Sequence, residues 1–253
     1  MVRILGLLLI IEFEGPKPYE KNEAVIKAYK TWKKCFEEKL WDVVRNHNEK
    51  VWLTLPEEIA RCRNLTLSRI IINKVPNSDD EKNYVGVMQT KPAIVVTLGV
   101  GFDVAVEKKL KNELPKGSLF FGADPISDKN EKIFSEIGTF FPVAVAATSK
   151  LANASVLKTE GGFYKNKLIE HVGFVDFVEN YVRQKFIDIL LLDNEGPEWD
   201  IFPMMTLGGE LDQRRITICQ MSVEFHYDGP GTRPKLVRLA ESLLKGEMID
   251  GFP

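Results

Sequence analysis

The sequence predicts an α/β protein with a Rossmann-like, doubly wound and mostly parallel sheet, preceded by an N-terminal helical extension. From residue 91 onward, short apolar runs alternate with charged, helix-forming stretches, and strands separated by helices pair in parallel through right-handed crossovers. The run Ile94–Leu98 turns through Gly99 and Gly101 into a helix-forming stretch, which is the layout of a nucleotide-cofactor loop. The run Phe186–Leu192 is almost entirely apolar, as expected of a central strand covered on both faces.

Composition narrows the class of protein. The chain has 253 residues, of which 44% are hydrophobic and 28% charged, which is ordinary for a globular protein with a real core. A net charge of -2 gives no bulk reason to expect nucleic acid or an anionic membrane as a partner. Cys35, Cys62 and Cys219 are too few for a disulfide scaffold and lack metal-ligand spacing. A Cys35–Cys62 bridge fits a secreted protein, and two reduced thiols are the favoured alternative.

The N-terminus leaves the compartment open. The apolar run Ile4–Ile11 resembles the start of a signal sequence, but Glu12 and Glu14 interrupt it. It is shorter than the ~20 residues that span a bilayer, so we expect no stable membrane span. Cytoplasmic and secretory locations both stay open, as does the oligomeric state.

Residues 1–90 are interpreted as the helical extension and residues 91–253 as the Rossmann-like domain. Apolar positions at three- and four-residue spacing predict a helix from Lys21 to about Arg45. Pro56, followed by two acidic residues, predicts the first turn of a second helix. Residues 76–83 are polar and predict a solvated loop. The expected core of the extension is Trp32, Trp41 and Trp52; a lid over the substrate is the alternative for this region.

The elements of the second region follow from the same periodicities. We expect sheet strands at residues 94–98, 118–123, 141–146, 186–192 and 216–225, and an added strand at 151–158. Helices are expected at residues 104–112, 128–137, 172–183, from 199 onward, and at 234–245.

Polar residues follow several of these strands. Ligands of open parallel sheets bind outside the carboxyl ends of the strands. Those ends carry Gly99–Asp103, Asp124, Asp193, Glu195, Glu224 and His226. Asp124 comes 23 residues after Gly101, where a carboxylate can accept hydrogen bonds from ribose hydroxyls. The alternative is a turn or helix-cap aspartate before Pro125.

The segment 193–198 places three carboxylates directly after a buried strand. Such a cluster is costly unless it meets a cation, hydrogen-bond donors or water, so a sulfonium or ammonium group of a ligand would suit it. The alternative is that acidic residues here serve to open a helix. We adopt this interpretation for Asp200 but not for Asp193. Glu224 and His226 form a plausible general-base pair, or a satisfied pair at a strand end. Only local composition favours Mg²⁺ here, so we expect no metal.

Taken together, these segments resemble the FkbM-type methyltransferase family, and more closely a divergent animal branch of it. The resemblance covers about residues 92–226, and its strongest piece is the acidic segment 193–198. It implies a class I S-adenosylmethionine-dependent enzyme that methylates a hydroxyl oxygen of a small molecule or glycan. The implied cofactor contacts are Gly99, Val100, Gly101, Asp103, Asp124, Pro125, Val143, Ala144 and Asp193. The implied catalytic residues are Asp193, Glu195 and His226.

The chain departs from the family pattern at several positions. The family often has an acid where Thr97 stands, a glycine where Asp103 stands and a lysine where Leu191 stands. Little sequence follows the fifth strand, so the closing antiparallel hairpin of class I methyltransferases is expected to be missing or displaced. These departures motivate an alternative function, a catalytically degenerate binding module. A nicotinamide-dependent oxidoreductase is disfavoured because Val104 replaces the third glycine of the dinucleotide pattern.

Overall fold

The computed structural model describes residues 23–66, 72–77, 81–86, 90–157, 164–226 and 231–245. The apolar run at residues 4–11 lies outside them. Within the described ranges, no helix is long and apolar enough to cross a membrane.

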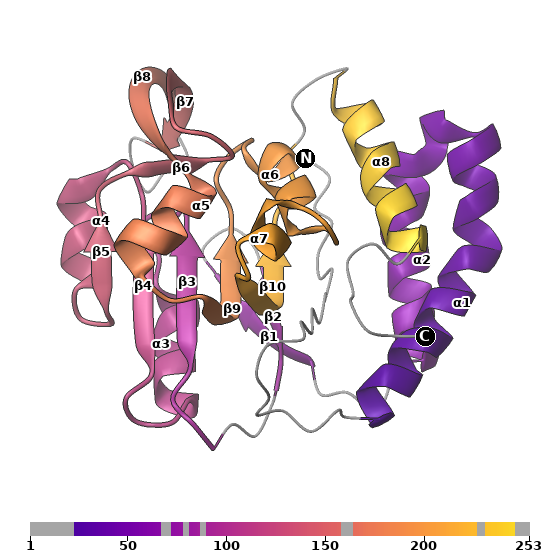
Figure 1. The fold of residues 1–253 in the computed structure, drawn as a ribbon, viewed down its shortest axis with the longest axis horizontal. Coiled ribbons are helices and arrows are strands. Elements are labelled where there is room, and N and C mark those ends of the chain that lie inside the picture. The colour runs from indigo at the N-terminus through magenta and orange to yellow at the C-terminus, as the bar shows by residue number, and fades with distance from the viewer. Residues whose placement is uncertain are drawn as a thin grey trace.

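The core of the molecule is the predicted parallel sheet. Its five strands pair in parallel throughout, in the order β10-β9-β3-β4-β5 (Figure 1). They span Ile94–Leu98 (β3), Leu119–Ala123 (β4), Thr139–Phe141 (β5), Phe186–Leu192 (β9) and Thr217–Val223 (β10). The strand order reverses at β3, which lies between β4 and β9. The topological switch point is therefore at the carboxyl end of β3, where the glycine-containing turn begins. No antiparallel strand joins this sheet among the described residues.

The predicted third strand is in fact two strands. β5 ends at Phe141, and β6 (Ala144–Ala146) belongs to a separate three-stranded sheet with β7 (Lys150–Leu157) and β8 (Tyr164–Gly173). Pro142 has no N–H for a ladder, and the N–H of Val143 turns back to the carbonyl of Phe141. β7 confirms the added strand. β8 was not predicted, and it takes up the first residues of the helix expected at 172–183.

Helices cover both faces of the sheet. One face packs against α3 (Ala105–Glu113) and α4 (Ser127–Phe134). The other packs against α5 (Phe174–Asp176), which continues as a π-helical segment at Phe177–Val182. The helix expected from residue 199 is interrupted: α6 (Glu198–Ile201), a 3₁₀ segment (Phe202–Met205) and α7 (Glu210–Gln213) replace it.

The N-terminal helices pack with the C-terminal one beyond β10 (Figure 1). α1 spans Glu23–Asn46, α2 spans Val51–Thr66 and α8 spans Thr232–Lys245. The predicted start of the second helix at Pro56 is wrong, because an apolar stripe begins one turn earlier; its buried members are Val51, Leu55, Ile59 and Cys62. Of the three tryptophans expected in this core, Trp32 is buried, whereas Trp41 and Trp52 are half-buried against it.

A disulfide joins α1 to α2. Cys35 and Cys62 are bonded, with their Cα atoms 5.7 Å apart, which corrects the favoured expectation of reduced thiols. Cys219 is a half-buried thiol outside this disulfide.

A β-hairpin precedes the parallel sheet. β1 (Ile72–Pro76) and β2 (Glu81–Val85) pair antiparallel, so the solvated loop expected at 76–83 is wrong at its ends. Lys82 and Asn83 are buried. The N–H groups of Asn83 and Val85 donate to side chains of β10, so the hairpin is fixed to the sheet that it covers.

Candidate active site

The predicted site residues meet at one edge because the hydrogen-bond ladder continues past the strand ends. After β3, β4, β9 and β10, the first residue donates its N–H to the carbonyl of the last residue of the neighbouring strand. The pairs, at 2.9–3.2 Å, are Glu224 to Leu192, Asp193 to Leu98, Gly99 to Ala123 and Asp124 to Phe141.

The glycine turn has two glycines with different roles. Gly99 has a φ of 83°, and a Cβ atom on it would lie 1.9 Å from the carbonyl oxygen of Asp193, so this position brings two strand ends together. Gly101 has a φ of 60°, and among the described residues no atom beyond its two chain neighbours lies within 4 Å of the place of a Cβ, so there is open space beside the backbone. The next residue, Phe102, is also left-handed, with a φ of 65°. Its N–H donates to the side chain of buried Asn130.

Asp124 fastens this turn. Its Oδ2 accepts the N–H groups of Val100 and Gly101 at 3.0 and 3.1 Å, and its Oδ1 accepts that of Ile126 at 2.8 Å. Burial raises the pKa of Asp124 by more than these hydrogen bonds lower it. The carboxylate therefore shapes the turn in addition to lining the cavity beside it.

A cavity of about 150 Å³ lies at this edge. Its lining includes most of the expected site residues: Gly99, Val100, Gly101, Asp124, Pro125, Val143, Ala144, Asp193 and Glu195. Asp103 instead lines a smaller adjoining cavity. Asn77, Asn130, Asn153 and His171 also line the larger cavity and were not expected to. No described residue of α1 or α2 lines it, whereas Asn77, from the same N-terminal region, does.

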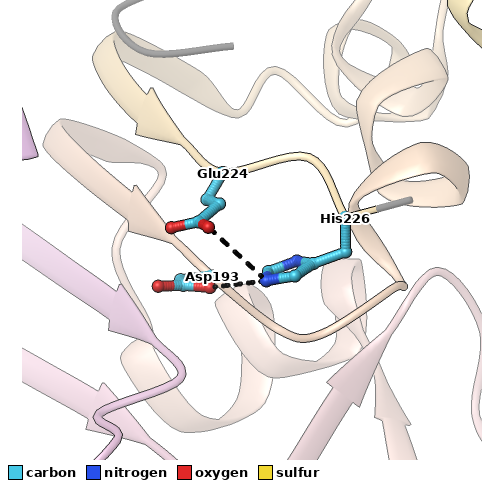
Figure 2. A group of neighbouring side chains, drawn as sticks. All are labelled: Asp193, Glu224 and His226. Carbon is cyan, nitrogen blue, oxygen red and sulfur yellow. Dashed lines mark ion pairs between the residues drawn. The ribbon is translucent and has the colours of Figure 1, made fainter. Parts of the chain in front are cut away.

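His226 lies at the centre of an acidic cluster formed by Asp193, Glu195, Glu198 and Glu224. Its Nε2 is 3.5 Å from Asp193, 3.4 Å from Glu195 and 3.8 Å from Glu224, and its Nδ1 is 3.3 Å from Glu198. Figure 2 shows the side chains of Asp193 and Glu224 converging on the imidazole. Both Glu224 and His226 lie just beyond β10 rather than within a strand.

The acidic cluster keeps His226 protonated. Burial by itself would lower the pKa of the imidazole, but the hydrogen bond with Glu198 and the charges of Glu198, Glu195 and Asp193 raise that pKa to about 9. At neutral pH His226 is therefore an imidazolium, which neutralises carboxylates and does not accept a proton.

Glu198 organises the loop after β9. Its side chain is fully buried, and its two oxygens accept the N–H groups of Asn194 and Gly196 at 2.6 and 2.8 Å. Between them Glu195 has a left-handed φ of 57°. Strained backbone of this kind concentrates at functional sites. Asp200, by contrast, forms an exposed ion pair with Lys235 of α8, in keeping with a helix-opening role.

The second cation of the cluster, Lys82, was not predicted from the sequence. Its Nζ lies 2.6 Å from Asp193 Oδ2 and 3.7 Å from Glu224 Oε2. It comes from β2, which is 111 residues away from Asp193. A lysine in a polar stretch carries no sequence signal for such burial.

The smaller cavity brings together the positions at which the chain departs from the family pattern. Thr97 and Leu191 line it beside Glu107 and Lys82. The hydroxyl of Thr97 donates to Glu107 at 2.7 Å, and burial raises the pKa of that glutamate. A carboxyl group and an ammonium group are thus present here, but they come from Glu107 of α3 and Lys82 of β2 and not from β3 and β9.

An all-parallel sheet with a glycine turn after β3, an aspartate after β4 and carboxylates after β9 and β10 defines a Rossmann-like cofactor-binding domain. A family model described as "Methyltransferase FkbM domain" matches residues 42–244. The chain therefore belongs to the FkbM methyltransferase family and is an S-adenosylmethionine-dependent methyltransferase. The match begins within α1, so it includes α2 and the β1–β2 hairpin. Searches of curated proteins and of solved structures found no match.

Proposed function

We propose that this enzyme methylates a hydroxyl oxygen of a small molecule or glycan, and that a carboxylate after β9, Asp193 or Glu195, takes the proton of that hydroxyl. The observation that carries the proposal is the division of charge at the cavity. Asp193 and Glu195 line its wall, while the neighbouring imidazole of His226 already holds a proton. A base must have its proton site empty and within reach of the acceptor.

The residues present suit S-adenosylmethionine. The open space at Gly101 leaves room for a ligand against the backbone of the turn. Gly99, Val100 and Gly101 would hold the methionine part, Asp124 and Pro125 the ribose, and Val143 and Ala144 the adenine. Asp103, in the adjoining cavity, would face the ammonium group. When bound, the cofactor supplies an electrophilic methyl group on a positively charged sulfur.

The charge of the acidic cluster supports this assignment. Four carboxylates face two cations, Lys82 and His226, so the cluster keeps a net negative charge. A fixed negative field beside the cavity favours a cationic ligand. The enzyme's contribution is then mainly to orient the acceptor oxygen and to remove its proton.

Amide side chains at the cavity support a hydroxylated acceptor. Asn77, Asn153 and Asn194 line it, and amides offer both donors and acceptors to hydroxyl groups. The Nδ2 of Asn194 is already used by the carbonyl of Val145 at 2.9 Å, which leaves its Oδ1 to accept. A compact sugar or polyol hydroxyl matches this lining.

The test is calorimetric titration of the folded chain with S-adenosylhomocysteine, with NAD as the control ligand. We expect micromolar binding that is lost in Asp124→Ala, and no binding of NAD. Failure of the folded protein to bind would overturn the cofactor assignment. A panel of hydroxylated acceptors follows, and cofactor binding with no transfer to any of them would support the binding-module alternative. Full turnover by Glu195→Gln would remove Glu195 as the base and leave Asp193.

A further inference from the structure

We propose that Lys82 is a positioning residue of the active site, which holds the carboxylate of Asp193 oriented toward the cofactor cavity. The β1–β2 hairpin, which lies outside the parallel sheet, thereby becomes part of the catalytic apparatus. This inference rests on the proposed function, because it assigns Lys82 a role through Asp193.

The burial of Lys82 is the first observation. The residue is 7% exposed, and a buried ammonium is costly unless an anion and hydrogen bonds compensate it. The compensating anions are Asp193 at 2.6 Å and Glu224 at 3.7 Å. The hairpin is held beside them, because Asn83 and Val85, which follow Lys82 in β2, are hydrogen-bonded to β10.

The second observation is that both oxygens of Asp193 are held, each by a different cation. Oδ2 meets the ammonium of Lys82, and Oδ1 meets the imidazolium of His226 at 3.5 Å. Two contacts to opposite oxygens fix the plane of a carboxylate in a way that one contact does not. Asp193 can then present a charged edge to the cavity that it lines.

The third observation concerns the groups that face Asp193. Glu224 approaches from the end of β10 and Glu195 from its own loop, while Asp103 and Glu107 share the smaller cavity with it. Each of these carboxylates opposes a further negative charge on Asp193. Lys82 and His226 offset this repulsion, so without Lys82 the carboxylate of Asp193 is held less firmly between them.

Lys82 also bears on metal binding. Ligand atoms of Asp193, Glu224 and His226 all lie within 4.8 Å of one another (Figure 2), which is a spacing that could hold an ion. The ammonium of Lys82 already bridges two of these three residues. The chain therefore supplies a cation of its own between those carboxylates.

A double-mutant cycle tests the proposal by calorimetric titration with S-adenosylmethionine. The four proteins are the wild type, Lys82→Met, Asp193→Asn and the double variant. We expect Lys82→Met to weaken binding by about tenfold, on the order of one lost charge-assisted hydrogen bond. In the Asp193→Asn background the same change should alter affinity by less than about twofold, because the group through which Lys82 acts is gone.

The matched control is Lys74→Met, which removes an exposed ammonium paired with Glu81 in the same hairpin and should leave affinity unchanged. If Lys82→Met does not fold, the double variant still tests the proposal, because it leaves no unpaired charge at position 82 or 193. Its affinity for S-adenosylmethionine should then equal that of Asp193→Asn. If the wild type binds the cofactor but Lys82→Met weakens binding equally in both backgrounds, or in neither, the role of Lys82 is overturned while the proposed function stands. Folded wild-type protein that binds neither S-adenosylmethionine nor S-adenosylhomocysteine overturns the proposed function and this inference with it.

Discussion

The two glycines of the turn after β3 provide a sharp test of how the site is built, because an added methyl group meets opposite surroundings at each. In Gly99→Ala the new Cβ would lie 1.9 Å from the backbone oxygen of Asp193. In Gly101→Ala it would enter open space beside the cavity. We therefore expect the first substitution to act on the fold and the second on cofactor binding.

The magnitudes follow from the geometry. A left-handed φ costs an alanine about 1–2 kcal/mol, and this applies at both positions. At Gly101 about 0.4–1 kcal/mol of this is offset by the reduced freedom of the unfolded chain, so the net loss is about 1 kcal/mol. At Gly99 the ends of β3 and β9 must also separate, and such overpacking adds about 1–3 kcal/mol or more. The loss there is roughly 3 kcal/mol or more.

Thermal unfolding and calorimetry measure the two effects separately. For a chain of this size, 1 kcal/mol corresponds to roughly 2–4 °C in Tm. We expect Gly99→Ala to lower Tm by roughly 6–12 °C and Gly101→Ala by roughly 2–4 °C, on the same scale. Gly101→Ala should nevertheless bind S-adenosylhomocysteine at least about tenfold more weakly, since its methyl group fills space used by a ligand. Equal losses of Tm, or wild-type affinity in Gly101→Ala, would refute the assignment.

Three further predictions concern the charges and the disulfide. The pKa of His226 rises from 6.5 in the unfolded chain to about 9 in the folded one, so its stabilisation is complete below pH 6.5 and is lost as pH rises toward 9. At 1.36 kcal/mol per pKa unit this stabilisation amounts to roughly 3 kcal/mol. The free energy of unfolding measured with urea should therefore fall more steeply with pH over that range in the wild type than in His226→Gln; parallel curves would contradict it. Glu198→Gln should destabilise the fold by about 2 kcal/mol, because buried N–H groups lose a charged acceptor. It should also lower the pKa of His226, which NMR can follow against His47 and His171; a pKa that stayed near 9 would argue against Glu198 as its main partner. Reduction of Cys35–Cys62, which closes a 27-residue separation, should cost roughly 3 kcal/mol and lower Tm by roughly 10 °C. Cys35→Ser should be insensitive to reductant, and a wild-type Tm unchanged by reductant would count against a stabilising bond.

Local patterns were sufficient for the parallel sheet and for the edge that carries the site. β3 and β9 were predicted at their observed bounds, since apolar runs of strand length between turn residues are set by the chain itself. Once strands are parallel, their carboxyl ends must meet, so Gly99, Asp124 and Asp193 could be placed together without coordinates. The family resemblance was likewise carried by short segments, and the family match confirms it.

Elements that depend on a distant partner were missed. The division of residues 139–146 between two sheets depends on where β8 lies, and the disulfide depends on how α1 packs on α2. The start of α2 was placed too late because a proline favours a first helical turn locally, whereas the buried stripe that extends the helix is satisfied by packing against α1 and α8.

By itself, the sequence determined the class of fold, the family and the strand-end residues that line the cavity, because each follows from spacing along a continuous segment. Only the tertiary structure decided the electrical state of the site. His226 keeps its proton because Glu198, Glu195 and Asp193 raise the pKa of its imidazole. Lys82 is buried because Asp193, 111 residues further along the chain, compensates its charge. The charge state of a side chain is set by neighbours in space, and those neighbours come from β2, β9 and β10.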